Sequence, residues 1–175
     1  MKGMGKWQMN RALSGKYRRC ARWISVVMIV LTLLLIYNFS SEDGAVSSAR
    51  SAQVARCVAR IVVPGYAQMS VRERVQAEEA LHTPIRKAAH MAEFAFAGCW
   101  LCVFARTLGI RGLRGAMWAF VGSLIFAALD ETHQLFVGGR GPSIRDVGID
   151  CLGAMVGIAV AAALLPRIAR RASKT

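Results

Sequence analysis

The sequence predicts an all-α integral membrane protein, a polytopic bundle of about four transmembrane helices with a helical extracytoplasmic segment between the first and the second. Two features of the composition indicate this class: 55% of the 175 residues are hydrophobic, and only 19% are charged. The third feature is their distribution, because the apolar residues form long blocks and the charged residues fall between them. Soluble domains of this length rarely show such a pattern.

The first span is predicted at 23–39, which contains no charged residue and follows a basic N-terminal arm at 1–22. A basic stretch before an apolar run also begins a secretory signal peptide. This apolar run is long for a signal peptide, and its flanks are typical of a retained signal anchor. We therefore expect the segment to remain in the protein as a transmembrane helix.

Three further spans are predicted, at 84–108, 115–136 and 144–165. Each has about 20 residues or slightly more, enough to cross about 30 Å of hydrocarbon. The second span is expected to begin with Pro84 at its first helical position and to end before Gly109. The fourth is expected to begin with a capping-box-like pair, Ser143 and Asp146, and to end at Pro166.

The outer segment, 40–83, also carries helical patterns. Its apolar residues recur at helical spacing opposite Arg56 and Arg60, which predicts a basic amphipathic helix on the membrane surface; they are Val54, Cys57, Val58, Ile61 and Val62. Ser70 and Glu73 are spaced to cap a second, short helix before the second span. A role in simply covering the bundle explains these helices equally well.

Loop charge predicts the orientation in the membrane. The N-terminal arm and the tail at 166–175 are basic, and so is the loop between the second and third spans, which holds Arg106, Arg111 and Arg114. An even number of spans places these three segments on one side, so we expect a multi-pass protein of the cell membrane with both termini cytoplasmic. The outer segment also contains arginines, which weakens the contrast between the two sides.

Basic residues outnumber acidic ones, 23 against 10, and the formal net charge is +13. Nucleic-acid-binding proteins usually place such charge on a polar soluble surface, whereas here it flanks the apolar blocks. Anionic lipid headgroups attract Lys and Arg at that position. We therefore expect the lipid bilayer as a partner and no nucleic acid, while the oligomeric state is not indicated.

Polar and ionisable residues of the last three spans, and of the loop before the fourth, fall at the outer end of the predicted helices. They are Arg86, Lys87, His90 and Glu93 in the second span, Asp130, Glu131, His133 and Gln134 in the third, and Arg140, Arg145, Asp146 and Asp150 in the last loop and the fourth span. Such residues are costly inside a bilayer and often mark functional sites. Gly153 and Gly157 follow on nearly the same face as the two aspartates, a spacing that lets another helix approach closely.

At these residues the chain resembles the VanZ-like membrane protein family. The stretch RKAAHMAEFAFAG at 86–98 is similar to the family's R-K-x-x-H-x-x-E-[YF] motif. The stretch DETHQLFVGGRGPSIRDVGIDCLGAMVG at 130–157 is similar to its second motif, with glycine at Gly138 where many members have proline. FSSEDG at 39–44 matches a third stretch, and the whole resemblance covers about residues 23–165.

The resemblance implies a bacterial cell-membrane protein of about four helices that works in the cell envelope. The family's named member is linked to resistance to the glycopeptide antibiotic teicoplanin, whereas the molecular activity of most members is unassigned. The positions that match the family motifs are Arg86, Lys87, His90, Glu93, Asp130, Glu131, Gln134, Arg140, Asp146 and Asp150. Membership alone does not make this chain a resistance protein.

The first functional hypothesis is an outward-facing polar pocket that binds a lipid-linked or cell-wall precursor headgroup. Guanidinium and ammonium groups would contact its phosphate, and the residues expected to bind it are Arg86, Lys87, Gln134, Arg140, Arg145, Asp146 and Asp150. A purely structural ion-pair network, in which Arg140 and Arg145 pair with the acids, is the alternative.

The second hypothesis is a metal-assisted membrane hydrolase or transferase that acts on a phosphorylated headgroup. Its catalytic candidates are His90, Glu93, Asp130 and Glu131, and its weak metal-ligand candidates are His90, Glu93, Asp130 and His133, two His–carboxylate pairs at i,i+3 spacing. No cofactor is indicated. A transporter is disfavoured, because the polar residues lie at one end of the spans and no inverted repeat is visible.

Overall fold

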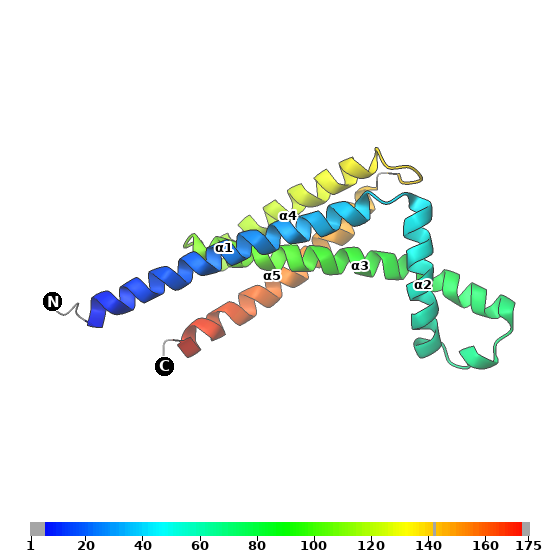
Figure 1. Ribbon diagram of the computed structural model, residues 1–175, viewed down its shortest axis with the longest axis horizontal. Helices are drawn as coiled ribbons and strands as arrows, with labels where there is room; N and C mark the ends of the chain where they lie inside the picture. The colour runs from blue at the N-terminus through cyan, green and yellow to red at the C-terminus, as the bar shows by residue number, and fades with distance from the viewer. Residues whose placement is uncertain (1–5, 142, 173–175) are drawn as a thin grey trace.

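A computed structural model describes residues 6–141 and 143–172 of the chain, and all its regular elements are helical. Four helices are long and apolar enough to cross a membrane: Gly15–Ser40, Val71–Thr107, Gly112–Gln134 and Ile144–Pro166. They run side by side as a bundle, and a shorter helix, α2, crosses one end of it (Figure 1). The predicted class, a polytopic helical membrane bundle, is confirmed.

The first and last helices place the two chain ends at the same end of the bundle (Figure 1). Helix α1 spans Lys6–Ser40, so it begins within the basic arm expected to precede the span. Helix α5 spans Ile144–Ala172 and continues past Pro166, where we expected it to end. Proline removes one helical hydrogen bond, and near the end of a span water can satisfy the carbonyl that loses its partner.

Helix α3 spans Val71–Thr107 without a break and contains Pro84 in its interior, so the expected helix start at this proline was wrong. The helix begins instead at the Ser70–Glu73 capping box, in which both reciprocal hydrogen bonds form. At 1.5 Å per residue its 37 residues span about 55 Å. That length exceeds the hydrocarbon core, so the first turns project beyond the bundle (Figure 1).

Helix α2, Gly44–Val62, packs against the projecting part of α3 through small residues, since its buried side chains are Ser51, Ala55 and Ala59. The apolar residues expected on the membrane surface face outward, with Ile61 the most exposed. Glu78 of α3 also connects α2 to α3, because its carboxylate accepts hydrogen bonds from Arg56 of α2 and from Tyr66. Tyr66 belongs to a short 3₁₀ helix, Tyr66–Gln68.

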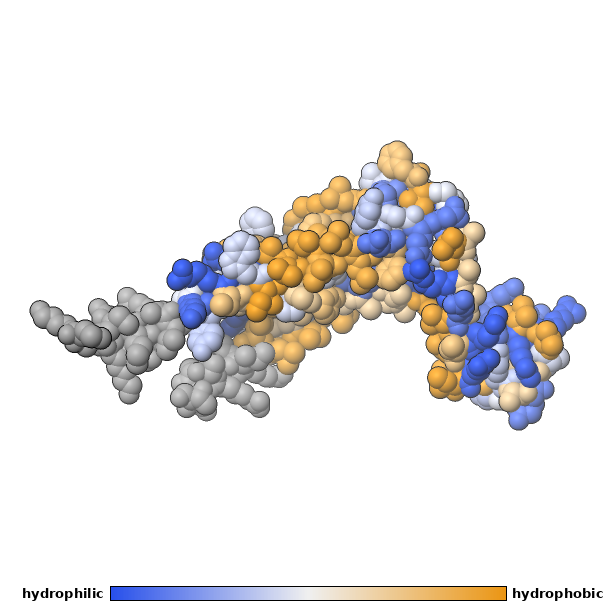
Figure 2. Space-filling view, in the orientation of Figure 1, coloured by the Kyte–Doolittle hydropathy of each residue, from blue (hydrophilic) through white to orange (hydrophobic). Residues whose placement is uncertain are grey.

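Helix α4, Gly112–Gln134, has the arrangement typical of a membrane bundle, with small residues inside and large apolar residues outside. Ala119, Ser123 and Ala127 are buried, whereas Trp118 and Ile125 are exposed. Exposed apolar side chains form a band along the long helices, and hydrophilic side chains gather over α2 and the start of α3 (Figure 2). This band is the surface expected to face lipid.

The most extensive contact between helices joins α3 and α5. A Cβ added to Gly153 would collide with the backbone carbonyl of Met91, and one added to Gly157 would collide with that of Ala95. One turn further along α3, a Cβ on Gly98 would lie 2.6 Å from the carbonyl oxygen of Ala154. The close approach predicted from the paired glycines is therefore confirmed, and it holds the polar ends of these two helices together.

Candidate functional site

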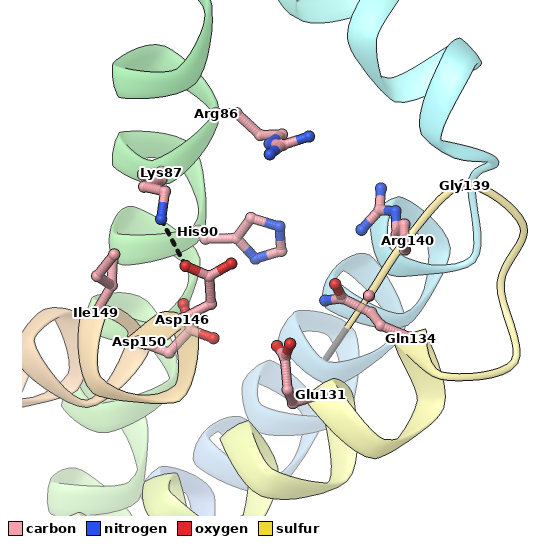
Figure 3. A pocket seen from close by; sticks show the side chains of 11 residues that line it. Arg86, Lys87, His90, Glu131, Gln134, Gly139, Arg140, Asp146, Ile149 and Asp150 are labelled. Atoms are coloured by element: carbon pink, nitrogen blue, oxygen red, sulfur yellow. Dashed lines mark hydrogen bonds and ion pairs between the residues drawn. The ribbon is translucent and has the colours of Figure 1, made fainter. Parts of the chain in front are cut away.

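A cavity of about 130 Å³ lies at the end of the bundle away from the chain ends. Helices α3, α4 and α5 and the loop before α5 supply its walls, and their polar side chains point toward a common space (Figure 3). Its polar and charged lining residues are Arg86, Lys87, His90, Glu131, Gln134, Arg140, Asp146 and Asp150. The expected convergence of these side chains is therefore present.

The loop that carries Arg140 is held by the turn between α1 and α2. The backbone N–H of Gly44 donates to the carbonyl oxygen of Gly138 over 3.0 Å. Next to it, Gly139 has φ of +71°, a conformation that favours glycine. A Cβ added to Gly138 would lie 2.8 Å from the Asp43 carboxylate, so Asp43 also packs against this loop.

Three acids at the site are buried. Relative exposure is 8% for Asp130, 7% for Glu131 and only 3% for Asp150. Asp130 accepts a hydrogen bond of 2.8 Å from Gln134, and Glu131 accepts one from the backbone N–H of Ser143 at the start of α5. Glu131 thus binds the backbone N–H of the residue that precedes α5.

The basic residues do not form the ion-pair network expected as the structural alternative. Lys87 pairs with Asp146 at 2.6 Å, whereas Arg140 donates to the backbone carbonyl of Phe39 at 2.9 Å. Within the described residues neither Arg86 nor Arg140 forms an ion pair with an acid. Burial, together with the neighbouring Arg86, lowers the pKa of Arg140 from its ordinary value. Two guanidinium groups therefore face the cavity without a carboxylate partner.

His90 and Glu93 lie one turn apart on α3, as their spacing predicts. The distance from Nδ1 of His90 to Oε2 of Glu93 is 3.8 Å, close enough for an ion pair but too long for a hydrogen bond. Both atoms are buried without a hydrogen-bond partner in the part of the chain described here. Buried polar atoms without a hydrogen-bond partner are uncommon in folded proteins.

Four predicted site residues do not line this cavity: Glu93, Asp130, His133 and Arg145. His133 contacts α1, with Nε2 3.0 Å from the Ser41 hydroxyl oxygen and its ring stacked at an angle on Tyr37. It does not join Asp130, which instead bonds to Gln134, so the expected second His–carboxylate pair is not formed. Arg145 is exposed on the first turn of α5 and does not line the cavity.

A second cavity, of about 180 Å³, was not expected from the sequence. It lies between α1, α2 and α3, and its apolar lining residues include Phe39, Val54 and Ile85. Arg86 and His90 line both cavities. No local pattern predicts this second cavity, because it depends on how α2 crosses the ends of α1 and α3.

One subset of the polar residues has the composition of a metal site. A ring nitrogen of His90 and carboxylate oxygens of Asp130 and Asp150 all lie within 4.8 Å of one another. The sequence had indicated His90 and Asp130 as candidates for this role but not Asp150. The site therefore contains two kinds of binding group. The guanidinium groups are suited to bind an anion, and the cluster of one histidine and two aspartates is suited to bind a cation.

Comparison with known proteins places these residues in a family. A family model described as VanZ/LLP1 matches residues 25–165, which overlap all four spans and include every residue that lines the two cavities. No curated protein and no solved structure matches the chain.

Proposed function

This chain belongs to the VanZ/LLP1 family, and from that premise we propose that it binds the phosphate of a lipid-linked or cell-wall precursor headgroup in the polar cavity. The observation that carries the proposal is the pair of guanidinium groups, on Arg86 and Arg140, that face one cavity without an acidic partner. Guanidinium groups bind phosphate through paired, charge-assisted hydrogen bonds.

The volume of the cavity limits the size of the group that can bind in it. Pockets for drug-sized ligands measure about 300–1,000 Å³, whereas this cavity has about 130 Å³. It therefore suits one compact group, such as a phosphate with a few water molecules. The remainder of a larger headgroup would lie outside, over the loop that contains Gly139 and Arg140.

The second cavity supports a lipid rather than a free phosphate as the ligand. Most of the surface of this cavity is apolar, although Glu42, Arg50 and Glu93 also line it, and it shares Arg86 and His90 with the polar cavity. An amphiphile could place its phosphate beside Arg86 and the start of its hydrocarbon chain between Phe39 and Ile85. Both cavities lie at the end of the bundle, where lipid headgroups and protein meet.

We further propose that this end faces outward, with both termini cytoplasmic. Basic residues near the opposite end support this orientation, because cytoplasmic flanks carry an excess of Lys and Arg; those in the described part include Lys16, Arg18, Arg19, Arg22, Arg106, Arg111 and Arg114. An outward-facing protein that holds a precursor headgroup would shield or withdraw what a glycopeptide such as teicoplanin meets outside the membrane. A change in teicoplanin susceptibility is therefore an expected consequence of headgroup binding.

The test is binding of defined lipids to the purified protein in detergent. We expect dioleoyl phosphatidic acid and a polyprenyl monophosphate to bind, and dioleoylglycerol, which lacks phosphate, not to bind. Arg86→Gln should weaken binding about tenfold or more, because a charge-assisted contact contributes about 1.5–3 kcal/mol.

Arg145→Gln is the matched control, since it removes the same charge from an exposed position outside the cavity. It should leave the affinity within about twofold of wild type. Equal affinity for lipids with and without phosphate, or equal loss in the two variants, would contradict the proposal. Inorganic phosphate that competes as well as the lipids would show that the apolar cavity contributes nothing.

The alternative activity, a metal-assisted hydrolase or transferase, stays a prediction. His90, Glu93, Asp130 and Glu131 remain its catalytic candidates. It requires that a phosphorylated lipid be converted during incubation with the protein and a divalent cation, which chromatography of the extracted lipid detects.

A further inference from the structure

Two buried carboxylates, Asp150 in the lining of the polar cavity and Asp130 close to it, form no ion pair with a basic side chain of the described residues. Asp130 and Asp150 are 8% and 3% exposed. The nearby basic groups are engaged differently, since Lys87 pairs with Asp146 and Arg140 donates to a backbone carbonyl. An uncompensated buried carboxylate is costly, and a bound cation is one way to remove that cost.

Asp150 is the more deeply buried of these two aspartates. It is almost fully buried, it has no hydrogen-bond partner for its carboxylate among the described residues, and it lines the cavity (Figure 3). Its position one turn above Gly153 brings it close to α3, where His90 lies. The tight packing of α3 on α5 therefore holds an unpartnered carboxylate against a histidine from another helix.

We propose that His90, Asp130 and Asp150 form a binding site for one divalent cation. Ligand atoms bound to one cation at about 2.2 Å lie at most about 4.4 Å apart. The three groups lie within 4.8 Å of one another, so changes of side-chain rotation would bring them into coordination of one cation. The cavity of about 130 Å³ has room for water molecules that complete the coordination sphere.

Neighbouring residues supply the contacts that commonly orient metal ligands. Gln134 donates to Oδ2 of Asp130 over 2.8 Å, which leaves the other oxygen of that carboxylate for a cation. Oε2 of Glu93 lies 3.8 Å from Nδ1 of His90 and could accept a hydrogen bond from Nδ1–H after a small movement, which would leave Nε2 as the ligand atom. Such outer contacts fix the histidine tautomer and the carboxylate orientation in metal sites.

The ligand set selects the class of cation. Two carboxylates and one imidazole suit Mn²⁺ or Zn²⁺ better than the softer ions, which prefer thiolates. Cys151 follows Asp150 in the sequence, but it does not line the cavity. The site does not depend on the proposed headgroup, because its three ligands are protein groups and its occupancy can be measured with no phosphate lipid present.

The experiment measures binding of Mn²⁺ alone to the purified, full-length protein in detergent, by electron paramagnetic resonance of the free ion. Mn²⁺ is the probe because the five cysteines of the chain could bind Zn²⁺ without specificity. We expect one Mn²⁺ per chain in the wild type. Asp150→Asn and His90→Gln should each weaken binding about tenfold or more, since even outer contacts contribute about 10–100-fold.

Glu131→Gln is the matched control. It removes a buried carboxylate from the same cavity but lies outside the three-residue cluster, and its amide oxygen can still accept from Ser143. We expect its Mn²⁺ affinity to stay within a few-fold of wild type. Absence of Mn²⁺ binding in a folded wild-type protein overturns the proposal, and so does an equal loss in Glu131→Gln and Asp150→Asn.

Thermal unfolding distinguishes a variant that has lost only the metal site from a variant that has lost its fold. Without metal, Asp150→Asn should unfold at the wild-type temperature or above it, because the substitution removes an uncompensated buried charge. Mn²⁺ should raise the midpoint of the wild type and leave that of Asp150→Asn unchanged. If Mn²⁺ raised the unfolding midpoint of both proteins equally, the proposed metal site would be contradicted. If Asp150→Asn lost Mn²⁺ binding but still bound phosphate lipids, headgroup binding would be shown not to require the metal site.

Discussion

Lys87 on α3 and Asp146 on α5 form an ion pair across the mouth of the polar cavity, with 2.6 Å between Nζ and Oδ1. Both side chains are partly exposed, so solvent screens their attraction. The pair joins the same two helices that pack most closely deeper in the bundle, through Gly153 and Gly157. It therefore adds a polar contact to an interface that backbone packing already defines.

A double-mutant cycle should show that this ion pair couples α3 to α5 only weakly. We expect Lys87→Met, Asp146→Asn and the double variant to give a coupling free energy of about 0.5–1 kcal/mol in thermal or denaturant unfolding. The coupling should shrink at high salt, because part of the pair is exposed. A coupling several times larger would mean that the cavity mouth is much less hydrated than the exposure of these side chains indicates.

The glycine at position 157 should be essential to the fold. A Cβ there collides with the carbonyl of Ala95, so Gly157→Ala must push α5 away from α3. Overpacking of this kind typically costs about 1–3 kcal/mol, and contact with backbone leaves little room to relax. Gly148→Ala is the control, because a Cβ at that position meets nothing within 4 Å. Equal thermal midpoints for the two variants would contradict the close packing of α3 and α5.

Native cysteines can report the orientation of the protein without new substitutions. Cys20, in the first half of α1, and Cys57, on α2, are both exposed. Helix α2 crosses the end of the bundle opposite the start of α1 (Figure 1). A membrane-impermeant maleimide applied to intact cells should modify Cys57 and spare Cys20, and both should react after lysis. Cys57→Ser serves as the control for the assignment of the label. Modification of Cys20 alone in intact cells would place the cavity on the cytoplasmic side.

Much of the bundle was predictable because membrane spans follow from length and hydrophobicity alone. The sequence correctly predicted the four spans, the capping box at Ser70 and the glycine end of α3, where Gly109 has φ of +89°. It failed at Pro84 and Pro166, which were expected to bound helices and instead lie inside them. A proline lowers helix stability locally, but packing of the flanking turns can outweigh that cost, and no local pattern reveals it.

The residues of the site were predictable in part. Helical spacing placed the polar groups of α3, α4 and α5 at one end, but it could not assign their partners. Lys87 rather than Arg140 pairs with Asp146, and His133 faces α1 instead of the cavity. Those outcomes depend on the rotation of each helix against its neighbours. The apolar cavity was missed for the same reason, since it needs α2 to cross α1 and α3.

The most direct test of the account is to map where a phosphate lipid binds. A phosphatidic acid analogue with a photoreactive group beside its phosphate would be crosslinked to the purified protein, and the modified peptides would be identified by mass spectrometry. The account predicts crosslinks concentrated at residues 86–90 and 138–141, and their loss in Arg86→Gln but not in Arg145→Gln. Crosslinks confined to the opposite end of the bundle, or spread evenly over the lipid-facing helices, would contradict it.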